Sequence, residues 1–360
     1  MAKKILVVDD SALMRRVICD IINSDERFQV AARAVDGLQA FDLLSRHQYD
    51  AVVLDVNMPR MTGLELLKEL RKYKIPARVM MASTDTREGA KTTLDALELG
   101  ALDFIHKPDN AAQCREGSFP EHLLRILDVV ADSSASVLEA EPKKKEDSAQ
   151  TTSKVVELAR KSTSRSAGSR IVAIASSTGG PKALQSVIPR LPAQLDAPVL
   201  LVQHMPKGFT ASLAERLNDL SEISVKEACE GDELQKGMVY VSTGGMHMKV
   251  KYTNGRHVIH YTDEPHREGV KPCANYMYES LAESRFDKVV CAVLTGMGAD
   301  GTEGIKNLES SKKIHVIAQD QASCVVYGMP RSVVNAGIPV QVVPLEQVAQ
   351  EIILNVGVKA

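Results

Sequence analysis

Residues 171–180 have the sequence Ile171-Val-Ala-Ile-Ala-Ser-Ser177-Thr-Gly-Gly180, an apolar run that ends in hydroxyl groups and glycines. Two later stretches share this form, Val199-Leu-Leu-Val-Gln-His204-Met-Pro206 and Val289-Val-Cys-Ala-Val-Leu-Thr-Gly-Met-Gly-Ala-Asp300-Gly301. Short apolar runs bounded by turn residues are typical of buried parallel strands. In open α/β sheets, chemistry collects at the carboxyl ends of such strands. The pattern therefore predicts that Ser177, His204 and Asp300 meet at one edge of a sheet.

The region from residue 170 to residue 356 is predicted to be one domain. Further strands are expected near residues 314–318 and 340–343, so that strands and helices alternate. Residues 225–261 differ, because Met248-Lys-Val-Lys-Tyr252 alternates apolar and polar residues and is followed by Asn254-Gly255, which suits a type I′ hairpin turn. We predict a doubly wound, mainly parallel α/β hydrolase-type domain with one antiparallel hairpin.

Residues 1–125 are predicted to form a separate α/β domain. The expected strands are Ile5–Val8, Val30–Ala34, Ala51–Leu54, Arg78–Ala82 and Leu102–Ile105. Strand–helix alternation with short connections implies a parallel sheet that is covered by helices on both faces. Residues 126–169 are assigned to a linker, because the sequence from about residue 131 is polar and cannot bury enough surface to offset its ordering entropy.

The composition of the 360-residue chain is that of an ordinary soluble protein. Charged residues make up 25% and the net charge is −2, which argues against nucleic-acid or membrane-surface binding. The six cysteines include no Cys-x-x-Cys pair, so we expect reduced thiols rather than disulfides or a zinc site. No apolar run is long enough for a signal peptide or a membrane span. We therefore expect a cytoplasmic protein without membrane insertion.

Carboxylates follow two predicted strands of the first domain. Asp9 and Asp10 come directly after the first strand and Asp55 comes after the third, with Asn57 close behind. Such carboxylates repel one another unless a hard cation joins them, and Mg²⁺ accepts oxygen ligands of this kind. Lys107 follows the fifth strand and can bring a positive charge to the same pocket. Carboxylates at strand ends are often only helix caps, but the full set in this order favours a functional site.

Three motifs of this region resemble those of response-regulator receiver domains: Leu6-Val-Val-Asp-Asp-Ser11, Leu54-Asp-Val-Asn-Met-Pro-Arg-Met-Thr-Gly63 and His106-Lys-Pro108. The resemblance covers about residues 3–125 and implies a flavodoxin-like (βα)5 fold. It implies that Asp55 accepts phosphate from a chemotaxis histidine kinase and that Lys107 pairs with the phosphoryl group.

The same resemblance implies a metal site and a switch residue. The residues that would hold Mg²⁺ for phosphorylation are Asp9, Asp10, Asp55 and, through its backbone carbonyl, Asn57. The hydroxyl that would sense the phosphoryl oxygens falls within Met81-Ala-Ser-Thr84, and we favour Ser83 over Thr84.

The residues around Ser177 have the features of a serine hydrolase site. A serine hydroxyl needs a base to activate it and a third group to orient that base. Ser177 precedes Thr178-Gly-Gly-Pro181 at a strand-to-helix turn, where backbone amides can stabilise an oxyanion. His204 is the predicted base and Asp300 the orienting group, so ester hydrolysis needs no metal. Ala175 replaces the first glycine of Gly-x-Ser-x-Gly, so the turn is not the common α/β-hydrolase elbow.

Other interpretations of these residues stay open. The turn after Ser177 is also compatible with a phosphate nest supported by Lys182, which would make the domain a nucleotide-binding module. His247 and His266 are rival bases, although neither ends an obvious buried strand. A third interpretation is an interaction protein whose hydrolase domain is inactive.

The motifs around these residues resemble the catalytic domain of the CheB chemotaxis methylesterase family. They are Ala175-Ser-Ser-Thr-Gly-Gly180, Gln203-His-Met-Pro-Lys-Gly-Phe209, Leu294-Thr-Gly-Met-Gly-Ala-Asp-Gly301 and Ala318-Gln-Asp-Gln-Ala-Ser-Cys-Val-Val-Tyr-Gly-Met-Pro330. The resemblance implies a protein-glutamate methylesterase and glutaminase. Such an enzyme demethylates glutamyl methyl esters and deamidates glutamines on methyl-accepting chemotaxis receptors, which gives adaptation in bacterial chemotaxis.

The resemblance also assigns roles to single residues. The nucleophile falls on Ser177 rather than Ser176, the base on His204, the third group on Asp300, and an oxyanion donor on the backbone of Met297. The segment His266–Asn275 departs from the family's usual Arg-Pro-Ser-Val-Asp pattern, because it contains Val-Lys-Pro-Cys-Ala-Asn. The union with a receiver suggests that the unphosphorylated receiver packs over the hydrolase edge and that phosphorylation opens it.

Overall fold

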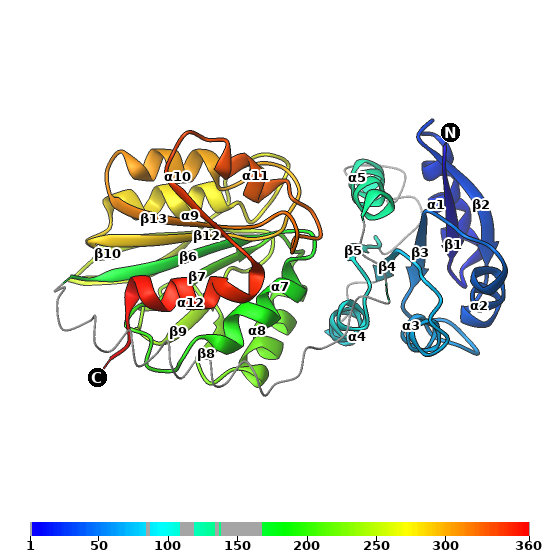
Figure 1. The fold of residues 1–360 in the computed structure, drawn as a ribbon, viewed down its shortest axis with the longest axis horizontal. Coiled ribbons are helices and arrows are strands. Elements are labelled where there is room, and N and C mark those ends of the chain that lie inside the picture. The colour runs from blue at the N-terminus through cyan, green and yellow to red at the C-terminus, as the bar shows by residue number, and fades with distance from the viewer. Residues whose placement is uncertain (1, 84–86, 109–118, 134–136, 138–167, 360) are drawn as a thin grey trace. The chain divides into compact units, whose positions relative to one another are not determined.

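The computed structural model describes residues 2–83, 87–108, 119–133, 137 and 168–359. The chain divides into two compact units, residues 1–142 and 143–360. Each unit has its own parallel sheet with helices on both faces (Figure 1). The predicted α/β class is therefore confirmed for both units.

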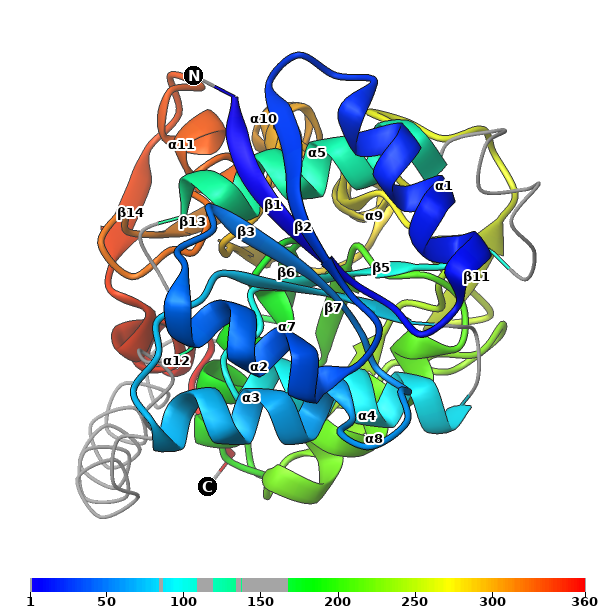
Figure 2. The ribbon, with the colours of Figure 1, turned by 90° about the vertical axis from the view of Figure 1, so that its right-hand side faces the viewer.

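The N-terminal unit contains a five-stranded sheet in the order β2-β1-β3-β4-β5, in which all neighbouring strands are parallel. Its strands are β1 (Lys3–Val8), β2 (Phe28–Ala34), β3 (Ala51–Asp55), β4 (Val79–Ser83) and β5 (Asp103–His106). Its helices are α1 (Ala12–Asn23), α2 (Gly37–Arg46), α3 (Gly63–Lys72), α4 (Arg87–Glu98) and α5 (Phe119–Asp132). Figure 2 shows α1 and α5 on one face of this sheet and α2, α3 and α4 on the other. This is the flavodoxin-like (βα)5 arrangement.

Local sequence signals bring α3 close to the end of β3. Thr62 caps the helix, because its side chain accepts from the Glu65 N–H while the Glu65 carboxylate accepts from the Thr62 N–H. A Cβ on Gly63 would lie 2.3 Å from the Asp55 carbonyl oxygen. Glycine at the first position of α3 therefore permits the helix to begin against the strand that carries Asp55.

The linker begins later than the predicted residue 126. Helix α5 continues to Asp132, and Ile126, Leu127 and Val130 are buried in the N-terminal unit. These apolar side chains lie at helical spacing, so the segment has enough surface to bury and folds with the sheet. Most of the remaining predicted linker, residues 138–167, lies outside the described residues.

The C-terminal unit contains a seven-stranded sheet in the order β14-β13-β12-β6-β7-β9-β8, again with parallel neighbours. Its strands are β6 (Arg170–Ser176), β7 (Val199–Gln203), β8 (Ser224–Glu227), β9 (Met238–Val241), β12 (Lys288–Val293), β13 (Lys313–Gln319) and β14 (Val340–Val343). After β6 the chain moves outward through β7, and it later returns to β12 on the other side of β6. The carboxyl ends of β6, β7 and β12 therefore surround a topological switch point, where α/β proteins place their sites.

Helices cover both faces of this sheet. Figure 1 shows α7 (Gly180–Val187), α8 (Phe209–Leu220) and α12 (Leu345–Val356) on one face and α9 (Ala274–Ser280), α10 (Thr302–Glu309) and α11 (Met329–Val334) on the other. Short 3₁₀ turns, η3 (Ile188–Arg190) and η4 (Leu281–Glu283), follow α7 and α9. The doubly wound prediction is confirmed.

The predicted hairpin is present, but two neighbouring strands were not predicted. Strands β10 (His247–Thr253) and β11 (Arg256–Thr262) pair antiparallel across Asn254 and Gly255, whose φ values of 51° and 82° suit a type I′ turn. Strands β8 and β9 instead extend the main sheet in parallel. Each has only four residues, which is too short for a clear periodic pattern.

The core of the C-terminal unit lies at the central strands. Every residue of β6 and β7 is buried, as expected for parallel strands that are covered on both faces.

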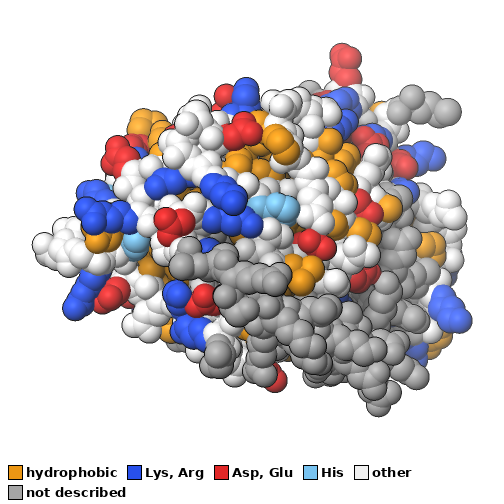
Figure 3. Space-filling model, turned by 60° about the vertical axis from the view of Figure 1, so that its left-hand side comes forward, with side chains coloured by type: hydrophobic (Ala, Val, Ile, Leu, Met, Phe, Trp, Pro, Cys, Tyr) orange, Lys and Arg blue, Asp and Glu red, His pale blue; other side chains and the backbone are white. Residues whose placement is uncertain are grey.

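On the face drawn in Figure 3, acidic and basic side chains of the described residues are interspersed rather than gathered by sign. The five described cysteines are free thiols, and Cys114 lies outside the described residues. Within the described residues, no helix has the length and apolar character needed to span a bilayer.

Replacing Leu201 by alanine tests how much this core contributes to the stability of the C-terminal sheet. Leu201 is fully buried in β7, so Leu201→Ala is expected to lower the opening free energy of the C-terminal sheet by about 2–5 kcal/mol. The measurement is hydrogen exchange of peptides from β6 and β7 by mass spectrometry. The matched control is Leu220→Ala, since Leu220 is 39% exposed and should cost no more than ~0.5 kcal/mol. Equal losses in the two variants would contradict the prediction.

Candidate active site and acidic cluster

Ser177 lies in the turn that joins β6 to α7. Its backbone N–H donates to the Thr295 carbonyl at 3.0 Å, and its carbonyl accepts from the Gly180 N–H at 2.7 Å. Gly179 has a φ of 76° at the helix N-cap, a conformation that glycine adopts without strain. The turn therefore holds Ser177 half-buried at the carboxyl edge of the sheet.

Ser176, the adjacent hydroxyl, has a different environment. Its side chain is fully buried, and its Oγ donates to Gln203 Oε1 at 2.7 Å. Gln203 Nε2 in turn donates to the carbonyl of Ser177 at 2.9 Å and to that of His204 at 3.1 Å. Gln203 thus joins the ends of β6 and β7, and Ser177 is the less buried serine of the pair.

His204 and Asp300 are brought together from the ends of β7 and β12. His204 Nε2 lies 2.7 Å from Asp300 Oδ2, and the two side chains are only 9% and 2% exposed. This contact occupies Nε2 and leaves Nδ1 as the second nitrogen of the ring. Among the described side chains, no hydrogen bond joins Ser177 Oγ to His204. Catalytic hydrogen bonds often tighten only when substrate binds, so this geometry is compatible with a serine–histidine pair.

Asp300 is held by the start of α9 as well as by His204. Its carboxylate accepts from Ala274 N at 2.6 Å, from Asn275 N at 2.9 Å and from Cys273 Sγ at 3.0 Å. Burial alone would raise the pKa of this carboxyl, but the hydrogen bonds from His204, Cys273 and Ala274 outweigh burial and lower the pKa to about 2. Asp300 is therefore ionised at neutral pH, as a group that stabilises an imidazolium must be.

The loop between β12 and α10 passes directly beside Ser177. A Cβ on Gly296 would lie 2.8 Å from the Ser177 Cβ, so only glycine permits this approach. Met297, the predicted oxyanion donor, follows Gly296 on this loop. Its position is compatible with a backbone donor near the Ser177 hydroxyl, and its role stays a prediction.

The alternative bases and the phosphate nest receive less support. His247 is fully buried, its Nδ1 accepts from Cys273 N, and burial lowers its pKa. His266 is exposed in the loop before α9. In the turn itself, the Gly180 N–H already donates to Ser177 and the Ala183 N–H to Gly179, so these amides are not available for a phosphate.

Sequence reasoning missed several residues that build this edge. They are Gln203, Thr295, Gln319 and the start of α9 at Cys273, Ala274 and Asn275. Thr295 is buried, its N–H donates to Gln319 Oε1 at 2.8 Å, and its Oγ1 donates to the Thr178 carbonyl at 3.0 Å. The available signal was a single polar residue that ends an apolar strand, as Gln203 and Gln319 do.

The acidic cluster of the N-terminal unit lies where the sequence places it. Ligand oxygens of Asp9, Asp10 and Asp55 lie within 4.8 Å of one another. They line a cavity of about 280 Å³ together with Asn57 and Lys107. Oxygen ligands gathered around such a space suit a hard divalent cation.

Charge in this cluster is only partly compensated. Lys107 Nζ lies 2.7 Å from Asp55 Oδ1 and 3.1 Å from Asp9 Oδ2, and all three side chains are buried. Burial is the main cause that raises the pKa of Asp55 to about 6, and the Asp9 charge adds to it against the opposing effect of Lys107. Although burial acts in the opposite direction, the carboxylates raise the pKa of Lys107. A further positive charge would therefore stabilise the ionised form of Asp55.

The predicted switch residue lies near this cluster. Ser83 is the last residue of β4, it is buried, and its carbonyl accepts from the Lys107 N–H at 2.7 Å. Thr84, the alternative, lies outside the described residues. The role of Ser83 stays a prediction.

Comparison with known proteins gives the family of this chain. The sequence model of the CheB methylesterase family matches residues 172–352, and that of the response regulator receiver domain matches residues 5–116. The chain belongs to the CheB methylesterase family. Its similarity to family members extends over both units, since the receiver match covers most of the N-terminal unit.

Individual members of the family support this assignment. The chain is 38% identical to a protein-glutamate methylesterase/protein-glutamine glutaminase of Geobacillus kaustophilus, over 98% of this chain and 99% of that protein. A protein of the same name from Pyrococcus abyssi is 40% identical, over 97% of this chain and 92% of its own length. The crystal structure of the Thermotoga maritima CheB methylesterase catalytic domain matches with a TM-score of 0.50 and 40% identity, over 52% of this chain and 98% of that chain.

The pKa of Asp55 gives a prediction for the pH dependence of receiver stability. Because folding raises this pKa from 3.8 to about 6, the protonated form is favoured in the folded receiver, and wild-type stability falls as pH rises through this interval. Asp55→Asn removes the titration. The variant should therefore be more stable than wild type by roughly 1–3 kcal/mol at about pH 7.5, and this gain should shrink at about pH 4.5.

Differential scanning calorimetry of the full chain measures this gain, in a buffer with a chelator that removes divalent cations. The matched control is Asp42→Asn, because Asp42 is 56% exposed in α2 and its variant should shift stability by no more than ~1 kcal/mol at either pH. A gain for Asp55→Asn that is the same at both pH values would contradict the prediction.

Proposed function

We propose that this chain is a phosphorylation-activated serine hydrolase that demethylates glutamyl methyl esters on methyl-accepting chemotaxis receptors and deamidates receptor glutamines. The observation that carries the proposal is the buried His204–Asp300 pair, with Nε2 and Oδ2 2.7 Å apart, at the sheet edge that also holds Ser177. The names of the relatives agree with this activity, and the attached receiver domain agrees with control by a histidine kinase.

The proposed reaction is two-step acyl transfer. Ser177 Oγ attacks the ester carbonyl while His204 accepts its proton at Nδ1, and Asp300 stabilises the imidazolium through Nε2. His204 then returns the proton to the departing methoxide, and methanol leaves an acyl-enzyme on Ser177. Water then attacks the acyl group while His204 accepts its proton. The bond to Ser177 Oγ breaks, His204 returns the proton to that oxygen, and the glutamate side chain is freed. Deamidation follows the same route with ammonia as the leaving group.

We assign the acidic cluster to phosphoryl transfer onto Asp55. Asp9, Asp10, Asp55 and the Asn57 carbonyl would hold Mg²⁺, which supplies positive charge beside the phosphoryl oxygens when bound. Lys107 pairs with Asp55 and with Asp9. Its positive charge is therefore close enough to pair with a phosphoryl group on Asp55. Ser83 at the end of β4 is the proposed sensor of that group.

Methanol release from methylated chemoreceptor membranes tests the activity. The full chain should release methanol, and a small-molecule phosphodonor with Mg²⁺ should raise the rate. Ser177→Ala should lower turnover by on the order of 10⁴–10⁶-fold, because no other hydroxyl replaces the nucleophile. Ser176→Ala is the matched control, since it removes a buried hydroxyl but leaves the proposed nucleophile. Methanol release that survives Ser177→Ala would contradict the mechanism.

Removal of the receiver tests its inhibitory role. A chain of residues 165–360 should be more active than the unphosphorylated full chain by roughly 5- to 150-fold, the range of a typical coupling free energy. The phosphodonor should raise the activity of the full chain but not that of the shortened chain. Methanol release is again the measurement, and an equally slow shortened chain would show that the receiver does not inhibit.

A further inference from the structure

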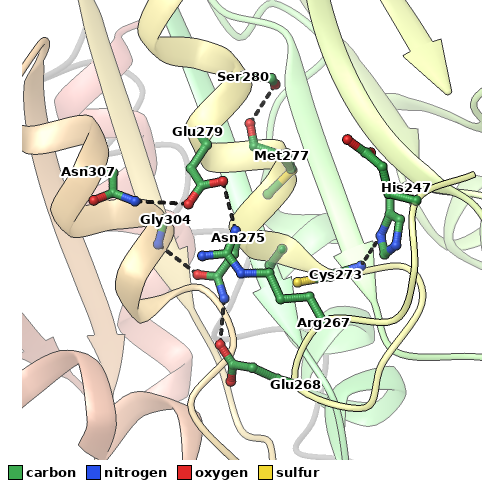
Figure 4. Close-up of polar contacts among 12 residues, drawn as sticks. His247, Arg267, Glu268, Cys273, Asn275, Met277, Glu279, Ser280, Gly304 and Asn307 are labelled. Atoms are coloured by element: carbon green, nitrogen blue, oxygen red, sulfur yellow. Dashed lines mark hydrogen bonds and ion pairs between the residues drawn. The ribbon is translucent and has the colours of Figure 1, made fainter. Parts of the chain in front are cut away.

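Asn275 is a fully buried polar residue in the first turn of α9 (Figure 4), and it contacts the proposed catalytic aspartate, Asp300. Its backbone N–H donates to Asp300 Oδ1 at 2.9 Å. Its side-chain Oδ1 accepts from Gly301 N at 3.1 Å and from Gly304 N at 2.7 Å. One residue therefore contacts the Asp300 carboxylate directly and also fixes the backbone that follows Asp300.

The second half of the Asn275 amide is used as well. Its Nδ2 donates to Glu268 Oε1 at 2.6 Å, in the loop that precedes α9 (Figure 4). The charges of Asp300 and His204 both act on the Glu268 carboxyl, so this carboxylate lies in the electrostatic field of the catalytic pair. Burial, followed by the Asp300 charge, raises the pKa of Glu268. The hydrogen bond from Asn275 stabilises the charged form against both effects.

The contacts require an amide at residue 275. An amide accepts through its oxygen and donates through its nitrogen, whereas an ionised carboxylate only accepts. Aspartate in this place would keep the bonds from Gly301 and Gly304 but would turn a second carboxylate toward Glu268. The surrounding backbone cannot move away easily, because a Cβ on Gly304 would lie only 2.7 Å from the Asn275 Cα.

We propose that Asn275 is a positioning residue for the catalytic pair, and that its amide and the Glu268 carboxylate act together to hold Asp300 against His204. The inference rests on the proposed hydrolase function. It also gives a physical role to the place where His266–Asn275 departs from the family pattern, since the amide and its carboxylate partner both belong to that segment.

A reversal of the hydrogen bond between residues 275 and 268 tests the proposal in the full chain with phosphodonor and Mg²⁺. In Asn275→Asp two carboxylates face each other, so kcat for methanol release should fall by roughly 10- to 100-fold while KM stays near the wild-type value. Adding Glu268→Gln supplies an amide donor from the opposite side. The double variant should therefore regain about 10-fold in kcat over Asn275→Asp.

A matched control is another asparagine–glutamate hydrogen bond, which joins α10 to α9. Asn307 Nδ2 in α10 donates to Glu279 Oε1 in α9 at 2.9 Å (Figure 4), and Asn307 is exposed. Asn307→Asp makes the same chemical change against a carboxylate, that of Glu279, whose other partner is Arg267. Within the described part of the chain, Asn307 forms no hydrogen bond to Asp300, Asn275 or Glu268. Its kcat and KM should equal those of the wild type.

A second readout separates this proposal from the choice of substrate. A fluorophosphonate forms a bond from Ser177 Oγ to phosphorus and releases fluoride, and the serine proton passes to His204. Mass spectrometry of Ser177 gives the rate of this reaction without a receptor. The rate should fall in Asn275→Asp, recover in the double variant and stay unchanged in Asn307→Asp.

The two readouts have distinct outcomes. If wild type releases no methanol but its phosphonylation follows this pattern, the receptor substrate is wrong and the positioning role stands. A wild-type rate in Asn275→Asp, or a double variant that neither folds nor regains activity, would overturn the positioning role while leaving the esterase intact. An unreactive Ser177 in the wild type would overturn both.

Discussion

The buried carboxylate of Asp300 is the constraint on which the C-terminal site depends. A charge withdrawn from water must be matched by hydrogen-bond donors, because its desolvation costs several kcal/mol otherwise. Asp300 has four such donors, from His204, Cys273, Ala274 and Asn275. They come from the end of β7 and the start of α9, so the need to satisfy one carboxylate fixes how these elements meet β12. The imidazole is oriented as a consequence of this packing.

The acidic cluster of the receiver shows the same physical effect with the opposite result. Asp55 and Asp300 are both buried, and burial raises the pKa of a carboxyl in each case. Hydrogen bonds from His204, Cys273 and Ala274 overcome burial at Asp300 and bring its pKa to about 2. Asp55 has Lys107 beside it and the repelling charge of Asp9, and its pKa is about 6. The charge of Asp300 is thus fully compensated by its hydrogen bonds. The charge of Asp55 is not, and a bound cation would supply the missing positive charge.

The fold and the placement of Ser177, His204 and Asp300 at one sheet edge could be predicted because they depend on local patterns. The apolar runs before Ser177, His204 and Asp300 mark buried strands, and parallel strands bring their carboxyl ends to one edge. Strands β8 and β9 were missed because four residues leave no period to detect. The boundary of the first domain was placed too early, at residue 125, because the polar composition of the following segment obscured the apolar spacing of Ile126 and Val130.

The residues that orient the site could not be predicted because their partners are distant in sequence. Asn275 and Gly304 are 29 positions apart, and Gln203 reaches Ser177 across 26 positions. Neither contact leaves a periodic mark, and an isolated asparagine or glutamine has no preferred role without its neighbours. A catalytic residue type can be recognised by its chemistry, whereas a positioning residue is defined only by what it touches. For this reason the departure from the family pattern at His266–Asn275 can be explained only from the structure. There the amide of Asn275 binds the carboxylate of Glu268, and its backbone N–H binds Asp300.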